Sequence, residues 1–190
     1  MITQHIEQQT PALQIYSIVS NISSFDDLEE THRRDTLAWI ASGAQLFRIA
    51  KPDVPNKHLV SYFIVFDEVA QKVLLVDHKK AQLWLPPGGH VELNEHPQEA
   101  VKRECREELS LKADFWRNEP LFLTTAVTVG LTVGHTDVSF WYVIRGDSSL
   151  EYTFDKDEFE AIKWFSFDQI PYERTDPHML RFINKLKTLI

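Results

Sequence analysis

The chain has 190 residues, of which 43% are hydrophobic and 25% charged, so it can bury the core of one globular domain with some additional structure. Its formal net charge of −8 opposes binding to a nucleic-acid duplex or to an anionic membrane surface. The apolar runs are far shorter than the roughly 20 residues that span a bilayer, the start of the chain lacks a secretory signal pattern, and a single cysteine excludes an internal disulfide. We therefore expect a cytoplasmic protein.

Residues 1–48 are predicted to form a helical extension, separate from a domain over residues 49–190. The segment SSFDDLEETHRRDTLAWIASG begins with cap-forming serines and acidic residues and ends at Gly43, as a helix does. The two prolines in KPDVPNKH then predict a loop. The charged stretch THRRD, residues 31–35, is interpreted as a solvated helix face, with a phosphate contact or a homodimer contact as alternatives.

Short segments of strand composition follow this loop. In chain order they are HLVSYFIVFD, KVLLVDH, QLWLPP, PLFLTTAVTV, DVSFWYVIRG and EAIKWFSF. Pro97–Leu109, between the third and fourth segments, has a helical pattern, and TDPHMLRFINKLKTLI predicts an amphipathic closing helix. This order predicts an α/β (α+β) fold, with a mixed sheet covered by helices on both faces.

The predicted helix that starts at Pro97 carries Glu104, Glu107 and Glu108 on one stripe, next to an apolar stripe that faces the core. Carboxylates this close together at the edge of a core need a compensating cation. Hard oxygen ligands favour Mg²⁺ or Mn²⁺. The alternative is a solvated acidic helix face. Gly88 and Gly89 are predicted to form a turn just before the helix.

Gly89, Glu95, Arg103-Glu104-Cys105, Glu107-Glu108 and Leu111 have the spacing G-x5-E-x7-R-E-U-x-E-E-x-G-U, where U is a bulky apolar residue. This segment closely resembles the Nudix box, and chance agreement of its specified letters would occur about once in 10⁷ start positions. The resemblance covers about residues 58–170 and implies a Nudix-like α/β/α sandwich. Ser110 replaces the glycine that usually ends the helix, and a left-handed conformation there would cost on the order of 1 kcal/mol.

The resemblance also implies roles for individual residues. Glu104, Glu107, Glu108 and the Gly88 carbonyl would hold Mg²⁺, with Mn²⁺ as a substitute, while Arg103 would orient the carboxylates and Glu95 would fix the turn by hydrogen bonds. The general base stays open between Glu104 and a later acidic residue. Glu158, six residues before Trp164, has a suitable spacing for that role, and a plain loop acid is its alternative.

Gly89 and His90 are expected to bind the substrate, with a solvated loop histidine as the alternative for His90. His135 and Asp137 are placed in a strand-end turn, with the rim of the pocket as the alternative. The eight histidines include no HExxH motif and no paired spacing, so a histidine zinc site is not expected.

The expected function is therefore hydrolysis of a diphosphate linkage in a small nucleoside diphosphate derivative, by a metal-activated water that attacks phosphorus. The alternative is a non-catalytic nucleotide sensor or regulatory module built on the same fold.

Overall fold

The computed structural model describes residues 10–51, 53–128 and 134–190. Helices α1 (Pro11–Asn21) and α2 (Asp27–Ala41) come first. The strands are β1 (Lys57–Asp67), β2 (Lys72–His78), β3 (Leu83–Leu85), β4 (Gly88–His90), β5 (Phe122–Val127), β6 (Thr136–Arg145) and β7 (Phe159–Ser166). Helix α3 (Pro97–Leu109) lies between β4 and β5, and α4 (Met179–Lys187) follows a short 3-10 turn at Tyr172–Arg174.

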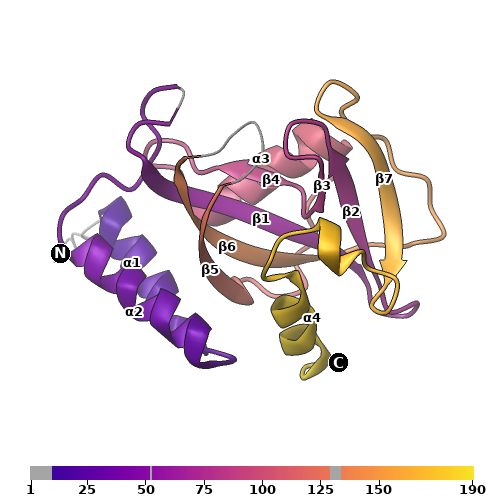
Figure 1. Ribbon diagram of the computed structural model, residues 1–190, viewed down its shortest axis with the longest axis horizontal. Helices are drawn as coiled ribbons and strands as arrows, with labels where there is room; N and C mark the ends of the chain where they lie inside the picture. Colours follow the sequence, from indigo (N-terminus) through magenta and orange to yellow (C-terminus); the bar gives the residue numbers. More distant parts are fainter. Residues whose placement is uncertain (1–9, 52, 129–133) are drawn as a thin grey trace, which may run out of the picture.

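The described strands form one mixed sheet, as the sequence predicted (Figure 1). The strand order is β3-β2-β1-β6-β5, with β4 beside β1 and β7 beside β2. At the centre, β1 and β6 pair in parallel from Lys57↔Thr136 to Phe66↔Arg145. The other pairings between these strands are antiparallel. Strand β1 is therefore the central element to which the other parts of the sheet are joined.

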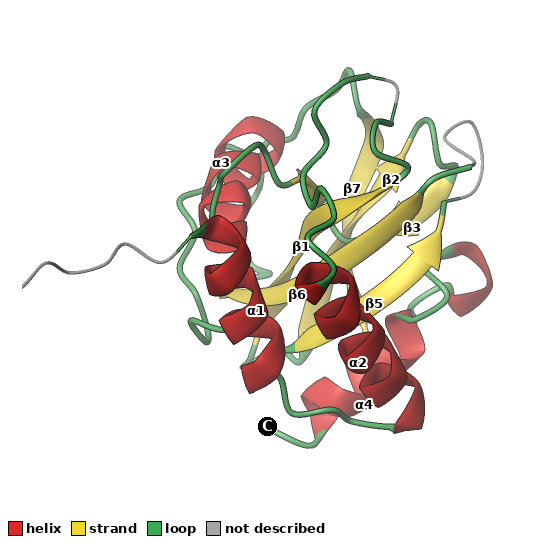
Figure 2. Cartoon of the chain, turned by 90° about the vertical axis from the view of Figure 1, so that its left-hand side faces the viewer, coloured by secondary structure: helices red, strands yellow, loops and turns green. Residues whose placement is uncertain are grey.

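Each face of the sheet packs against a different helix. Because side chains alternate along β1, Leu59 and Phe63 join the core cluster that contains the buried residues of α3. Ile64 and Phe66 join the cluster that contains the buried residues of α4. Figure 2 shows α3 and α4 at opposite sides of the sheet. The prediction of helices on both faces is confirmed.

Helices α1 and α2 confirm the prediction of helical structure in this part of the N-terminal extension; residues 1–9 lie outside the described residues. Helix α2 lies along β5, the last strand in the sheet order. The Glu29 carboxylate accepts a hydrogen bond from the Leu123 N–H at 3.1 Å, and His32 Nδ1 accepts one from the Thr125 N–H at 3.3 Å. The helix thus satisfies backbone donors along an edge strand, which protects that edge from pairing with another chain.

The predicted turn at Gly88 and Gly89 is wrong. Both residues belong to β4, where Gly88 pairs with Tyr62 and Gly89 with Ser61 of β1. Gly88 has φ 138°, and a Cβ at this position would lie 2.2 Å from the Ser61 carbonyl oxygen. The glycine therefore permits a close approach of two strands, a demand that the sequence pattern does not distinguish from that of a turn.

In the part of the chain that the structure describes, the helices are too short or too polar to cross a bilayer.

Candidate functional site

Helix α3 has the limits that the sequence predicted. At its start, the His96 side chain accepts a hydrogen bond from the Gln98 N–H at 3.1 Å, and Pro97 occupies the first turn. At its end, Ser110 has φ 52° and ψ 29°, so the expected left-handed conformation is present, and its N–H bonds to the Arg106 carbonyl. These two ends fix the register of the acidic stripe.

The three glutamates differ in exposure because each lies at a different angle from the apolar stripe. At about 100° per residue, Glu108 lies roughly 20° from Val101, Glu104 roughly 60° and Glu107 roughly 120°. Glu108 is 4% exposed, the Glu104 side chain 12% and the Glu107 side chain 61%. The stripe therefore runs from the core to the surface, and only Glu104 and Glu108 lie at the edge of the core as expected.

Strand β4 lies directly against these carboxylates. The Gly88 N–H donates a hydrogen bond to Glu108 Oε2 at 2.8 Å. A Cβ at Gly89 would lie 2.3 Å from Glu104 Oε1. The glycine pair thus brings backbone polar groups and two carboxylates into one small space, in which an ion could contact both.

Arg103 connects α3 with the loop before it. Its guanidinium donates hydrogen bonds to both oxygens of Glu95 at 3.1 and 3.0 Å, to Glu104 Oε1 at 2.5 Å and to the His90 carbonyl at 3.0 Å. Glu95 also accepts a hydrogen bond from the Glu92 N–H at 2.9 Å. Arg103 can therefore hold Glu104 in one orientation, and Glu95 holds the loop.

Electrostatics at the site favour a cation. Burial raises the pKa of Glu108 well above its usual value, and the negative charges of Glu104 and Glu158 raise it further. Burial also raises the pKa of Glu104, although Arg103 opposes the shift. Partly buried carboxylates that repel one another are stabilised by a divalent ion, and their oxygen atoms are the ligands that Mg²⁺ and Mn²⁺ prefer. The donor set therefore fits such an ion.

Glu158, which the sequence proposed as a later acidic residue, lies just before β7 and close enough to raise the pKa of both Glu104 and Glu108. Its Oε1 is 3.3 Å from His78 Nε2. Sequence reasoning missed Asp155, whose N–H donates a hydrogen bond to the Glu108 carbonyl at 2.8 Å. Nothing in the acidic loop sequence distinguishes Asp155 from its neighbours, because its role depends on contact with α3.

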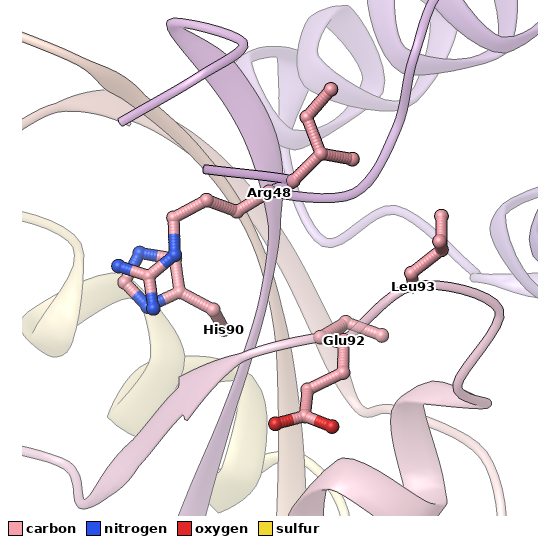
Figure 3. Close-up of a pocket in the computed structure, with 6 residues that line it drawn as sticks. Arg48, His90, Glu92 and Leu93 are labelled. Atoms are coloured by element: carbon pink, nitrogen blue, oxygen red, sulfur yellow. The ribbon is translucent and has the colours of Figure 1, made fainter. Parts of the chain in front are cut away.

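His90 is not a solvated loop residue, because it belongs to β4 and burial lowers its pKa to about 3, with the positive charge of Arg48 as the next cause. It lines a cavity of about 290 Å³. In Figure 3, Arg48 extends toward the His90 ring on one side of this pocket, while Glu92 and Leu93 lie on the other. The expected contact of His90 with substrate stays a prediction.

The mixed sheet between helices and the Gly–Glu spacing that leads into acidic helix α3 define a Nudix-type hydrolase. The chain belongs to the NUDIX family, since its residues 57–186 match the NUDIX domain. No curated protein matches the chain.

Solved structures with the same fold include three that differ in how much of this chain they cover. The MutT NUDIX hydrolase from Burkholderia pseudomallei is 23% identical with a TM-score of 0.57, and the match covers 68% of this chain and 98% of that one. The E. coli dihydroneopterin triphosphate pyrophosphohydrolase is 12% identical with a TM-score of 0.56, and the match covers 77% of this chain and 100% of that one. A UDP-X diphosphatase is 14% identical with a TM-score of 0.54, and the match covers 93% of this chain and 92% of that one. Because so much of this chain is covered, the likeness extends into the N-terminal helices.

Proposed function

We propose that this chain hydrolyses a diphosphate linkage in a small nucleoside diphosphate derivative and uses Mg²⁺, with Mn²⁺ as a substitute. In this proposal Glu104, Glu107, Glu108 and the Gly88 carbonyl hold the metal. The observation that carries it is the pair of largely buried carboxylates of Glu104 and Glu108, each with a raised pKa, next to the backbone of β4. Such a pair needs a cation, and a cation on this strand can attract an anionic substrate.

A bound divalent ion lowers the pKa of a water ligand and stabilises negative charge on phosphoryl oxygens. Residues of the protein would orient the metal-binding carboxylates and take the proton from the attacking water. Arg103 holds Glu104 by the 2.5 Å hydrogen bond, so that carboxylate keeps one position during the reaction. Glu104 and Glu158 are the two candidate proton acceptors. The missing Cβ of Gly89 leaves room for the Glu104 carboxylate beside β4.

The net charge of the protein fits a metal-dependent reaction on a diphosphate. A diphosphate would be repelled by a protein of net charge −8 unless cations lay between them. The names of two structural neighbours, a triphosphate pyrophosphohydrolase and a UDP-X diphosphatase, also refer to hydrolysis in a phosphate chain. Because the likeness to the second extends into α1 and α2, nucleoside diphosphates linked to a second group are the first substrates to test. The partners in this proposal are small molecules, without nucleic-acid duplexes or membranes.

The test is a panel of nucleoside diphosphate derivatives, assayed for phosphate-containing products with and without Mg²⁺, on the parent and on Glu107→Gln. Glu107 is a suitable site because its side chain is 61% exposed and the change does not disturb packing. Glu99→Gln is the matched control on the same helix, since Glu99 is 56% exposed and pairs with Lys102. We expect Glu107→Gln to lower kcat/KM by about 100-fold or more, while the control keeps the parent value.

Two outcomes would contradict the proposal in different ways. Equal turnover by Glu107→Gln and the parent would remove the assigned metal role of that carboxylate. Tight binding of a nucleotide without turnover, by a parent protein loaded with Mg²⁺, would favour the sensor function instead.

A further inference from the structure

Three histidines and an aspartate from separate segments lie close together, and one of them, His90, lines the pocket shown in Figure 3. Asp53 lies in the loop before β1, His58 in β1, His90 in β4 and His135 just before β6. Each offers one ligand atom, and these four atoms lie within 4.8 Å of one another. The His58 ring centroid is 4.7 Å from that of His90 and 5.0 Å from that of His135. We refer to these four residues as the histidine cluster.

The histidine cluster lies on the opposite side of the sheet from α3. His58 alternates with Leu59 along β1, and Leu59 belongs to the core cluster of α3. His90 is opposite Val60 in the β1–β4 pair, so its side chain is on the same face as that of His58. Glu104 and Glu108 pack from the other face. The histidine cluster is therefore separate from the carboxylates proposed to bind Mg²⁺.

The hydrogen-bond positions around His58 require a positive group. Its Nδ1 is 2.8 Å from the Pro55 carbonyl oxygen, which can only accept, so Nδ1 carries the proton of the neutral ring. Nε2 of that ring then has a lone pair, and it is 3.4 Å from Asp137 Oδ1, which is another acceptor. Within the described structure both atoms are buried without a hydrogen-bond partner. Two acceptors that face each other in a buried site are stabilised only by a cation or a proton.

The other members of the histidine cluster point to the same space. His135 Nε2 is 3.2 Å from Asp137 Oδ1, and His135 Nδ1 is 3.4 Å from Asp53 Oδ2. His90 Nε2 is buried and has no hydrogen-bond partner among the described residues. One nitrogen atom from each of three imidazoles and one oxygen atom of a carboxylate thus converge. The His58 side chain is fully buried.

We propose that the histidine cluster, Asp53, His58, His90 and His135, binds a transition-metal ion with the ligand preference of Zn²⁺. Three imidazole nitrogens and one carboxylate oxygen form a complete tetrahedral set for this ion. Bonds of 2.0–2.1 Å place tetrahedral ligands about 3.3 Å apart, so the four atoms need to move inward by about 1 Å or less each. In this assignment His90 is a metal ligand in place of the substrate contact expected from its sequence position.

The charges near the histidine cluster agree with a divalent ion. Asp53 and Asp137 bring two carboxylates, whereas Arg48, which lines the same pocket as His90, brings one guanidinium. Asp137 Oδ1 is 3.2 Å from His135 Nε2 and can orient that imidazole from the second layer when Nδ1 binds the ion, whereas the Pro55 carbonyl has this role for His58. The ion ties the loop that carries Asp53 to the start of β1.

A protonated His58 paired with Asp137 is the alternative to a metal ion. It provides a positive group for that single contact. It does not account for a buried His90 Nε2 without a partner, nor for the position of Asp53 at His135. A metal ion accounts for all of these contacts together.

The test uses Co²⁺ as the probe, because Co²⁺ in a tetrahedral nitrogen-rich site absorbs visible light far more strongly than in an octahedral oxygen site. The purified full chain is treated with a chelator, transferred into excess Mg²⁺ and titrated with Co²⁺. We expect one equivalent with tetrahedral bands, which Zn²⁺ displaces. His135→Asn should abolish the bands, and Asp53→Asn, at a half-buried loop position, should weaken binding about 10-fold or more.

Two control variants distinguish the histidine cluster from metal binding elsewhere in the chain. His178→Gln removes a histidine outside the histidine cluster, and Glu107→Gln removes a carboxylate of α3; both should keep the bands. A parent protein that shows no tetrahedral bands would overturn the proposal in favour of a protonated His58. Bands that disappear in Glu107→Gln, or that persist in both His135→Asn and Asp53→Asn, would overturn it as well. If His135→Asn does not fold, the Asp53→Asn titration decides.

Discussion

Gly88 and Gly89 are adjacent, but each needs to be glycine for a different reason. A Cβ at Gly88 would meet the Ser61 carbonyl oxygen at 2.2 Å, and φ at this residue is 138°. A Cβ at Gly89 would meet the end of the flexible Glu104 side chain at 2.3 Å. The first obstacle is backbone, which cannot move without breaking the β1–β4 pairing. The second is a carboxylate that can rotate away.

We therefore predict that alanine substitutions separate stability from activity at these two positions. Gly88→Ala should lower the free energy of unfolding by about 2–3 kcal/mol, because it adds backbone strain and a clash. Gly89→Ala should keep most of the stability but reduce Mg²⁺-dependent hydrolysis, because Glu104 is displaced. Thermal unfolding and the hydrolysis assay on both variants measure the two effects, with about 2–4 °C expected per kcal/mol. Equal losses of stability would contradict this difference.

At the scale of elements, α3 was predictable to its ends and β4 was not. Pro97 and the apolar stripe set the start and register of α3, and these are local properties of the sequence. The different exposures of Glu104, Glu107 and Glu108 follow from the same helical geometry. The pairing of β4 with β1 depends instead on a partner far along the chain, and two glycines are compatible with a turn or with closely paired strands.

The histidine cluster, like β4, could not be predicted from the sequence, because it depends on contacts between distant segments. His58, His90 and His135 are widely spaced in the sequence, so no motif of the HExxH type can indicate them. Their proximity arises because β1, β4 and β6 are neighbours in the sheet. The acidic stripe was predictable because its members share one helix, whereas the histidine cluster depends on strand pairing.

The contact between α2 and α4 is predicted to weaken in mild acid. His32 of α2 and His178 before α4 have ring centroids 5.4 Å apart. Burial and then Arg181 lower the pKa of His178 to about 4, and the same causes lower the pKa of His32. In the unfolded chain these two histidines bind protons near pH 6.5, whereas in the folded chain they do so only at lower pH. The free energy of unfolding therefore falls as the pH drops from about 6.5 toward 4. Asp26, whose pKa is lowered to about 2 chiefly by its hydrogen bond with Arg181, stays charged in this range.

Urea unfolding at several pH values between 7.5 and 4.5 measures this effect. We expect His178→Gln to reduce the loss of unfolding free energy across the range, because glutamine does not titrate. The double change His32→Gln and His178→Gln should reduce it further. A pH dependence identical to that of the parent in both variants would show that the loss arises elsewhere.

At the scale of the whole molecule, the N-terminal helices share the core of the rest of the chain. Ile15, Val19 and Ile40 belong to the same core cluster as Leu59 of β1. Glu29 of α2 is fully buried and accepts hydrogen bonds from the Lys185 side chain of α4, at 2.8 and 2.9 Å, and from the Leu123 N–H of β5. One carboxylate therefore joins three elements. The division at residue 48 stays a prediction.

The last prediction follows from this buried ion pair. Glu29→Gln removes the charge that compensates Lys185, which is 7% exposed, and should lower the free energy of unfolding by about 3–5 kcal/mol. Glu30→Gln is the matched control on the same helix, because its partner Arg33 can turn toward water, and only a small change is expected. Denaturant unfolding followed by tryptophan fluorescence measures both.

The double change Glu29→Gln and Lys185→Met separates the two causes of such a loss. If the cost arises from an uncompensated buried ammonium, methionine should restore much of the stability, since an apolar side chain of similar length has no charge to compensate. Glutamine keeps one acceptor oxygen, so it can lose the hydrogen bond to only one of the Leu123 and Phe25 N–H groups. If the cost arises from that lost hydrogen bond, the double variant should stay as unstable as the single one. Restored stability would show that α2 stabilises the molecule by neutralising the Lys185 charge of α4. A persistent loss of stability would show that it does so by accepting hydrogen bonds from backbone N–H groups, including one of edge strand β5.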